Sequence, residues 1–305
     1  MDKTFFFLSG LPRAGGTLLS ALLNQHPDIH SGPDSPLAAL MSWNLKVLDN
    51  NEQNLMYPKE GVDERIIKSV ANAYYEDVPE QYIFDKCRIW SACANVDMIR
   101  KYLNKDVKIV VCVRDVVEVL ASYIKLIHEL PPNPDPIHAS QDNFIDQQLF
   151  KDGSRNPNLG DDDNRCEWLM KENGLIQVAL DALYQSKDQS FVHLVEYNDL
   201  VTNTQEVMDG IYDFLGIIPL TNHDLNNIVN PFKVNDEALG FPTLHEVRSS
   251  ISVASIPPKD ILSEYIVNRY TGMEFWRSDF GGMNSQQGAC AVSYTHLTLP
   301  TIYSV

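Results

Sequence analysis

The chain has 305 residues, 44% of them hydrophobic and 10% aromatic, which is enough to bury a large core. Its formal net charge of −17 argues against a general nucleic-acid binder, because an acidic surface repels phosphate. We expect neither a signal peptide nor a membrane span, since no apolar run is long enough. The five cysteines show no zinc-binding spacing, which favours a reduced, cytoplasmic protein without a metal site.

Four short apolar runs predict β-strands at Thr4–Ser9, Tyr82–Asp85, Lys108–Val113 and Phe191–Glu196. Helical patterns separate them, at Thr17–Asn24, Pro36–Asp49, Asp63–Tyr75, Asp97–Leu103, Val116–Glu129, Arg165–Gln185 and Thr204–Leu215. Strands that alternate with helices indicate a parallel sheet covered on both faces. We therefore expect an α/β, P-loop-like three-layer fold, with a central parallel sheet of four to five strands flanked by helices. Ligands of such sheets bind beyond the carboxyl ends of the strands.

Two stretches predict irregular structure, and the end of the chain looks foreign. Residues 130–164 are rich in Pro, Asn, Asp and Gly and predict a long loop or lid, and residues 230–258 predict a second irregular segment. The run Ser293–Thr301 resembles a translated sequencing-adapter tail. We therefore expect one domain over residues 1–287 and a non-native tail over residues 288–305.

The first predicted strand leads into a glycine-rich turn and then a helix, the order typical of a phosphate-binding loop. Gly10, Gly15 and Thr17 fit the nucleotide-binding pattern G-x-x-x-x-G-K-[ST], but Gly16 stands at the lysine position and Arg13 supplies a cation within the loop. Free N–H groups at a helix start attract anions, and glycine lets a phosphate approach the backbone. The loop predicts a nucleotide whose transferred group is not a γ-phosphoryl. An ordinary strand–turn–helix is the alternative.

A second candidate anion site follows the third predicted strand. Arg114 stands at the strand end, and Ser122 lies two turns into the next helix. An arginine fork with a hydroxyl suits a terminal phosphate monoester. The alternative is a structural surface pair of Arg114 and Asp115.

Together these motifs resemble those of the sulfotransferases that use 3′-phosphoadenosine 5′-phosphosulfate (PAPS), in particular the bacterial and tyrosylprotein-type branch. The family loop P-[KR]-S-G-[TS]-T-L appears as Pro12-Arg13-Ala14-Gly15-Gly16-Thr17-Leu18, and the family motif R-D-x(6)-S as Arg114, Asp115 and Ser122. The resemblance spans roughly residues 3–277. It implies that the loop binds the 5′-phosphosulfate and that Arg114 and Ser122 bind the 3′-phosphate.

Two further segments resemble the family. Glu196-Tyr197-Asn198-Asp199-Leu200 is similar to its Y-E-D-L segment, which implies that Tyr197 lies near the adenosine phosphates. Leu244-His245-Glu246-Val247-Arg248 looks like a segment of bacterial members and implies that Arg248 contacts the cofactor. The chain also departs from the family: Ala14 and Gly16 replace hydroxyl residues of the loop, and the lysine expected after Arg248 is not evident.

The resemblance also implies catalytic roles. Arg13 matches the loop cation at the leaving oxygen, and Lys86 matches the family lysine that could hold the sulfonate, a solvated lysine being the alternative. Cytosolic members use a histidine two residues after that lysine, where this chain has Arg88. Tyrosylprotein-type members use a glutamate after the first helix, and the same spacing places Asp34 as the general base. A helix N-cap is the alternative for Asp34.

The predicted function is that of a sulfotransferase, which moves the sulfuryl group from PAPS to a hydroxyl acceptor by in-line displacement, without a metal. The acceptor would be a small molecule, a carbohydrate or a tyrosyl peptide, and the sequence predicts no particular oligomeric state. Two alternatives stay open, a P-loop kinase-like phosphotransferase and a non-catalytic nucleotide-binding protein.

Overall fold

A computed structural model describes residues 3–130, 145–146, 161–251 and 257–277. Within this part of the chain, five parallel strands form one sheet in the order β2-β3-β1-β4-β5. The strands are β1 (Thr4–Gly10), β2 (Ile29–Asp34), β3 (Tyr82–Lys86), β4 (Ile109–Val113) and β5 (Val192–Glu196). The expected α/β fold with a central parallel sheet flanked by helices is confirmed.

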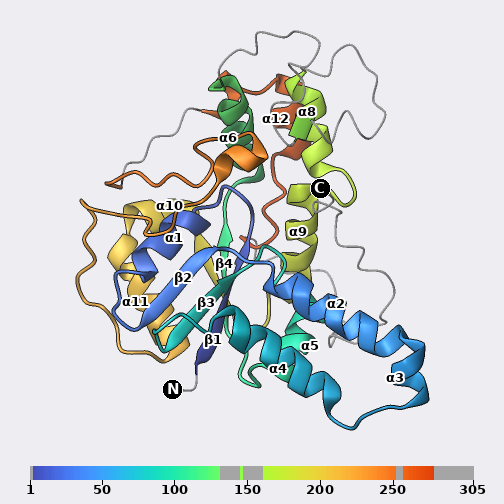
Figure 1. Cartoon of the computed structure of the whole chain (residues 1–305). Coiled ribbons are helices and arrows are strands. Elements are labelled where there is room, and N and C mark those ends of the chain that lie inside the picture. The colour runs from blue at the N-terminus through green and yellow to red at the C-terminus, as the bar shows by residue number, and fades with distance from the viewer. Residues whose placement is uncertain (1–2, 131–144, 147–160, 252–256, 278–305) are drawn as a thin grey trace.

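Helices cover both faces of the sheet (Figure 1). In Figure 1, α1, α10 and α11 lie on one side of the strands and α2, α4 and α5 on the other. The described α-helices are α1 (Gly16–Leu23), α2 (Leu37–Asn50), α3 (Glu52–Met56), α4 (Val62–Tyr74), α5 (Cys93–Tyr102), α6 (Val116–His128), α8 (Asp162–Met170), α9 (Leu175–Ser186), α10 (Tyr197–Thr202), α11 (Thr204–Leu215) and α12 (Glu264–Tyr270). Two 3₁₀ helices are η2 (Asp236–Leu239) and η3 (Pro258–Asp260).

The central strand β1 explains why the sheet is buried on both faces. Successive side chains of a strand point to opposite faces. Accordingly, Phe5 and Phe7 belong to the hydrophobic cluster that includes α2, α4 and α5, whereas Phe6 and Leu8 belong to the cluster that includes α1 and α6. All four side chains are buried. A continuous apolar run is therefore what this position in the sheet requires.

One element prediction was wrong, and the edge strand of the sheet was missed. The predicted helix Arg165–Gln185 is two helices, α8 and α9, because the chain turns at Asn173 and Gly174. Asn173 has a left-handed φ of 63°, and a Cβ on Gly174 would lie 2.6 Å from the carbonyl oxygen of Leu169. Strand β2 was not predicted, since Ile29–Asp34 contains Ser, Gly and Pro and pairs with β3 as an edge strand through an irregular register.

The other regional predictions have mixed outcomes. Residues 230–251 are irregular apart from η2, as predicted. Most of the predicted loop at 130–164, and the whole predicted tail at 288–305, lie outside the described residues. Among the helices of the described part, none is both long and apolar enough to cross a membrane.

Candidate active site

A cavity of about 680 Å³ opens beyond the carboxyl ends of the strands. It is lined by the loop after β1, the ends of β2, β3 and β4, the helix α6 and the irregular segment 234–251. Most of the residues expected from the sequence line it: Pro12, Arg13, Gly15, Gly16, Thr17, Leu18, Asp34, Lys86, Arg114, Ser122, Tyr197 and Arg248. Ala14 is not among the lining residues, and its side chain is buried in the hydrophobic core.

The glycine turn allows close backbone contacts that a side chain would block. Gly10 has a φ of 123°, and a Cβ there would lie 2.1 Å from the carbonyl oxygen of Cys112 on β4. Gly15 has a φ of 88°, and its Cβ would lie 2.9 Å from the Tyr197 ring. Left-handed backbone at these two positions suits glycine. The turn can therefore present the first N–H groups of α1 to the cavity.

Arg13 connects the two candidate anion sites. Its Nε lies 3.2 Å from the Ser122 hydroxyl oxygen, and its Nη1 donates to the Leu244 carbonyl at 2.5 Å. Burial lowers the pKa of Arg13 from its ordinary value, with Arg114 adding to the effect. The guanidinium thus faces Ser122 rather than the start of α1, and the two motifs share one cavity.

Arg114 is fixed by three contacts. Its Nε pairs with Glu118 at 2.9 Å, its Nη1 donates to the Arg13 carbonyl at 3.2 Å, and its guanidinium carbon lies 4.2 Å from the centre of the Tyr197 ring. A cation over an aromatic face is attracted by the ring. These contacts bring the residues expected at the 3′-phosphate together. They also argue against the alternative of a surface pair between Arg114 and Asp115, because Arg114 pairs with Glu118 instead.

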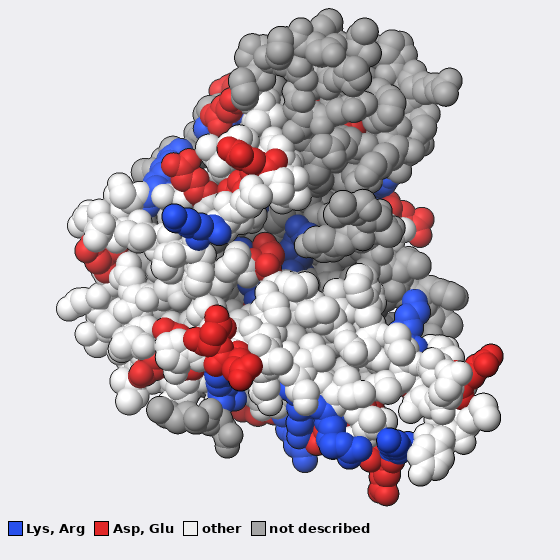
Figure 2. All heavy atoms as spheres, viewed as in Figure 1, with Lys and Arg blue, Asp and Glu red and all other residues white. Residues whose placement is uncertain are grey.

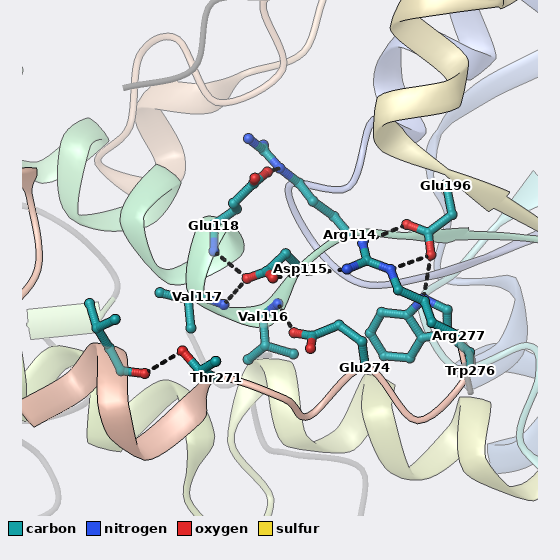
Figure 3. Close-up of polar contacts among 11 residues, drawn as sticks. Arg114, Asp115, Val116, Val117, Glu118, Glu196, Thr271, Glu274, Trp276 and Arg277 are labelled. Atoms are coloured by element: carbon teal, nitrogen blue, oxygen red, sulfur yellow. Dashed lines mark hydrogen bonds and ion pairs between the residues drawn. The ribbon is translucent and has the colours of Figure 1, made fainter. Parts of the chain in front are cut away.

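The C-terminal segment supports the backbone next to Arg114 (Figure 3). Asp115 caps α6 by accepting from the N–H groups of Val117 and Glu118, and Glu274 accepts from the N–H of Val116 at 3.1 Å. Figure 3 also shows the Arg114 side chain directed towards Glu118 and away from these C-terminal residues.

A bidentate ion pair holds the same C-terminal segment against the end of β5. Arg277 binds Glu196 through two hydrogen bonds of 2.8 and 2.9 Å, and the Trp276 indole N–H donates to the same carboxylate at 2.8 Å (Figure 3). Paired N–H bonds from arginine to a carboxylate fix both distance and direction. The segment is therefore docked beside α6 by Glu196 and by the start of the helix.

Asp34 and Lys86 face each other across the ends of β2 and β3. Lys86 Nζ lies 3.5 Å from Asp34 Oδ2, and a Cβ on Gly16 would lie 3.3 Å from Lys86 Cε. Lys86 is therefore the cation beside the start of α1. Burial raises the pKa of Asp34, but the nearby Lys86, His245 and Arg88 together bring it well below its ordinary value. Asp34 lines the cavity, and 42% of its side chain is accessible there.

Asp34 is not the cap of α2, whose N-cap residue is Pro36. The neighbouring Ser35 hydroxyl oxygen accepts from the Leu37 N–H at 3.1 Å, and the hydroxyl donates to Asp85 at 2.5 Å. Asp85 is fully buried and also accepts from Tyr75 and Trp90 at 2.6 and 2.7 Å. Three donors on one buried carboxylate anchor the chain on both sides of the Asp34–Lys86 pair.

The sequence assigned no role to three further residues around Asp34. His245 places Nε2 3.8 Å from Asp34 Oδ2, and Asp236 binds the other ring nitrogen of His245. Arg88 also lines the cavity. His245 belongs to a segment that resembles bacterial sulfotransferases, but no spacing rule pairs residues 236 and 245 across an irregular loop.

Basic side chains outnumber acidic ones around the cavity, although the whole chain is acidic. Six Lys or Arg and four Asp or Glu line it. Figure 2 shows blue and red side chains together within the hollow near the middle of this face. Among the described residues, no group of three or more His, Cys, Asp or Glu is arranged to hold a metal ion. The site therefore offers cations and backbone N–H groups for an anionic ligand.

Comparisons with known proteins found similar sequences and structures. Mouse protein-tyrosine sulfotransferase 1 is 27% identical over 96 residues, and the human protein of that name is 26% identical; each alignment covers 28% of this chain and only 25% of the relative. A solved sulfotransferase domain from the curacin biosynthetic pathway has a TM-score of 0.49 and 18% identity, covering 88% of this chain and 97% of that one. The sulfotransferase domain of the Synechococcus PCC 7002 olefin synthase has a TM-score of 0.44 and 17% identity, covering 88% and 94%.

The family model described as "Sulfotransferase domain" matches residues 3–237. The match includes the glycine turn, Asp34, Lys86 and the Arg114 motif. This chain therefore belongs to the sulfotransferase domain family.

Proposed function

We propose that this chain transfers the sulfuryl group of PAPS to a hydroxyl acceptor by direct in-line displacement. The observation that carries the proposal is the junction of the two anion motifs. The Arg13 side chain meets Ser122, and the Arg13 carbonyl meets Arg114. Both motifs thus face one cavity, which suits a single ligand with two phosphate groups.

The cavity also fits such a ligand in size and chemistry. Pockets for cofactor-sized molecules measure about 300–1,000 Å³, and this one measures about 680 Å³. In the proposed complex the turn from Pro12 to Leu18 holds the 5′-phosphosulfate through backbone N–H groups. Arg114 and Ser122 bind the 3′-phosphate, with Tyr197 and Arg248 beside them. The proposed domain, residues 1–287, contains all of these groups, and we propose a cytoplasmic location for it.

PAPS would supply the sulfuryl group, and the protein supplies the charges around it. Lys86 is proposed to neutralise the sulfonate near the start of α1. Arg13 is proposed as the cation at the leaving oxygen, and this role requires its guanidinium to turn from Ser122 towards the 5′-phosphate. Asp34 is proposed as the base that receives the acceptor hydroxyl. Cations aimed at developing negative charge lower the barrier most where water is excluded.

The acceptor is proposed to be a small molecule, a carbohydrate or a tyrosyl peptide. The tyrosylprotein relatives match over only a quarter of their own length, so they do not select among these. The family match favours sulfuryl transfer over the kinase-like alternative. The assay described next distinguishes a sulfotransferase from a non-catalytic nucleotide-binding protein.

The test is incubation of the full chain with ³⁵S-labelled PAPS and a panel of phenols, alcohols, sugars and tyrosyl peptides. We expect a sulfate ester on at least one acceptor and a loss of about 100-fold or more in kcat for Lys86→Ala, the range for removing one oxyanion-stabilising donor. Lys68→Ala is the matched control, because Lys68 is an exposed lysine paired with Glu64 on α4.

Binding of PAPS without transfer to any acceptor would identify a nucleotide-binding protein. Magnesium-dependent turnover of ATP without PAPS binding would identify a phosphotransferase. Either result would end the proposal.

A further inference from the structure

His245 stands in a chain of charged groups at the edge of the cavity. Its Nδ1 lies 2.5 Å from Asp236 Oδ1, and its own backbone N–H donates to Asp236 Oδ2 at 2.8 Å. Its Nε2 lies 3.8 Å from Asp34 Oδ2, which in turn lies 3.5 Å from Lys86 Nζ. The order is Asp236, His245, Asp34 and Lys86.

The contacts of Asp236 fix both the tautomer and the direction of the ring. Asp236 is buried, and it holds His245 through the backbone and the side chain at once. A carboxylate on Nδ1 makes that nitrogen the donor and leaves Nε2 as the nitrogen that can accept a proton. A carboxylate orients a catalytic histidine in the same way in the Ser-His-Asp triad of hydrolases. Here Nε2 faces the cavity beside Asp34.

We propose that His245, oriented by Asp236, takes the proton of the acceptor hydroxyl, while Asp34 holds the Lys86 ammonium beside it. This inference rests on the proposed sulfuryl transfer and refines the role given to Asp34 there. It names a histidine from the segment before Arg248, which lines the same cavity as Arg88.

The geometry leaves His245 Nε2 available to the acceptor. Asp236 occupies Nδ1, the 3.8 Å from Nε2 to Asp34 Oδ2 is longer than a hydrogen bond, and His245 lines the cavity. A hydroxyl that donates its proton to Nε2 would lie near the Lys86 ammonium, which is 3.5 Å from Asp34 Oδ2, and therefore near the cation proposed to hold the sulfonate.

The step balances without another reactant. The acceptor oxygen forms its bond to sulfur while the bond between sulfur and the 5′-phosphate oxygen breaks, and that electron pair leaves with the phosphate. The acceptor proton goes to His245 Nε2, where the carboxylates of Asp34 and Asp236 balance the imidazolium charge. Solvent then takes the proton from the ring.

The proton affinities of the two candidates agree with this division. A base works best when its pKa lies near the working pH, and the charges around Asp34 hold its pKa far below that range. The Asp34 carboxylate, 3.8 Å from Nε2, raises the pKa of His245 most, burial lowers it, the hydrogen bond with Asp236 raises it and Lys86 lowers it. The net result is a pKa above the ordinary value of 6.5. Since a base must be neutral, the activity should fall as the pH drops through the pKa of His245.

The experiment measures kcat against pH for the full-length parent protein and for His245→Gln, with labelled PAPS and the best acceptor of the panel. We expect kcat to fall at least 100-fold in the variant, within the usual range for a lost general base. The acidic limb of the profile should disappear. Asp236→Asn should lower kcat at least tenfold. Affinity for 3′,5′-adenosine bisphosphate, measured by calorimetry, should stay within threefold in both variants.

His128→Gln is the matched control. His128 forms an Asp–His pair with Asp162 at 2.8 Å, but it is exposed and is not among the residues that line the cavity. This variant should keep the parent kcat and pH profile. In a second variant, His245→Ala, added imidazole should restore part of the rate, in proportion to its unprotonated fraction.

Three results would overturn the inference. The first is a kcat of His245→Gln within threefold of that of an active parent, and the second is a parent kcat that does not fall at low pH. The third is a rate of His245→Ala that added imidazole does not raise. Loss of bisphosphate affinity together with kcat in His245→Gln would show a structural role instead. A parent that transfers sulfate to no acceptor ends the proposed function and this role with it. An active parent with an unaffected variant ends this role alone.

Discussion

Arg114 illustrates how a single side chain can be prepared for an anion. Glu118 and the Arg13 carbonyl occupy part of its donor set, and Tyr197 covers one face of the guanidinium. Its direction is thus set before a ligand binds, which lowers the ordering cost of binding. A lysine would keep the charge opposite Glu118 but lose the planar fork and much of the stacking.

Arg114→Lys should therefore weaken binding of 3′,5′-adenosine bisphosphate by about tenfold. That equals about 1.4 kcal/mol, near the lower end for a hydrogen bond to a charged group. Binding of adenosine 5′-monophosphate, which has no 3′-phosphate, should change by less than twofold. Titration calorimetry with the two nucleotides measures this difference. Arg65→Lys on α4 is the control, because Arg65 lies outside the cavity. Equal losses for both nucleotides would contradict the assignment of Arg114 to the 3′-phosphate.

Helix α6 depends at its first turn on a neighbouring and a distant carboxylate, Asp115 and Glu274. Asp115 caps two N–H groups, and Glu274 supplies the acceptor for the N–H of Val116 (Figure 3). Unpaired N–H groups at a helix start are costly unless side chains or water satisfy them. Because Arg114 lies just before this turn, the C-terminal segment should support both the helix and the anion site.

Glu274→Ala should lower the free energy of unfolding by about 1–3 kcal/mol, the cost of leaving one N–H unsatisfied. It should also weaken bisphosphate binding, because the backbone beside Arg114 loses a support. Glu274→Gln keeps an acceptor oxygen at the same position and should stay close to the parent in both measurements. Urea unfolding and calorimetry compare the two variants. If Glu274→Ala and Glu274→Gln lower the free energy of unfolding equally, the charge of Glu274 rather than the hydrogen bond stabilises the helix.

Elements with local signals could be predicted from the sequence, whereas those defined by distant contacts could not. Strand β1 is an apolar run that is followed at once by a glycine turn and the start of a helix, and this order is visible in the sequence. Both anion motifs also directly follow a predicted strand. The edge strand β2 has no such pattern and exists because β3 offers it hydrogen-bond partners. The pair of Asp236 and His245 depends on the path of an irregular segment, which no periodicity specifies. The candidate anion groups were therefore foreseeable, but the surroundings of Asp34 were not.

Over the whole molecule, the local and global charges have opposite signs. The chain carries −17 overall, while six Lys or Arg surround the cavity against four Asp or Glu. Self-repulsion of a large net charge destabilises the compact state, and dissolved salt screens it. The same salt screens the attraction between the cavity and an anionic ligand. Stability and ligand affinity should therefore respond to salt in opposite directions.

Raising NaCl from about 0.05 to 0.5 M shortens the Debye length from more than 10 Å to less than 8 Å. We expect the Tm of the free protein to rise over this range, while the affinity for 3′,5′-adenosine bisphosphate falls by about tenfold or more. Scanning calorimetry and titration calorimetry measure the two quantities on the same sample, and KCl in place of NaCl separates screening from ion-specific binding. A Tm that falls with salt would mean that local ion pairs outweigh the net repulsion. An affinity for the bisphosphate that does not change with salt would mean that charge attraction contributes little to its binding. That result would contradict the role proposed for Lys86 and the arginines of the cavity.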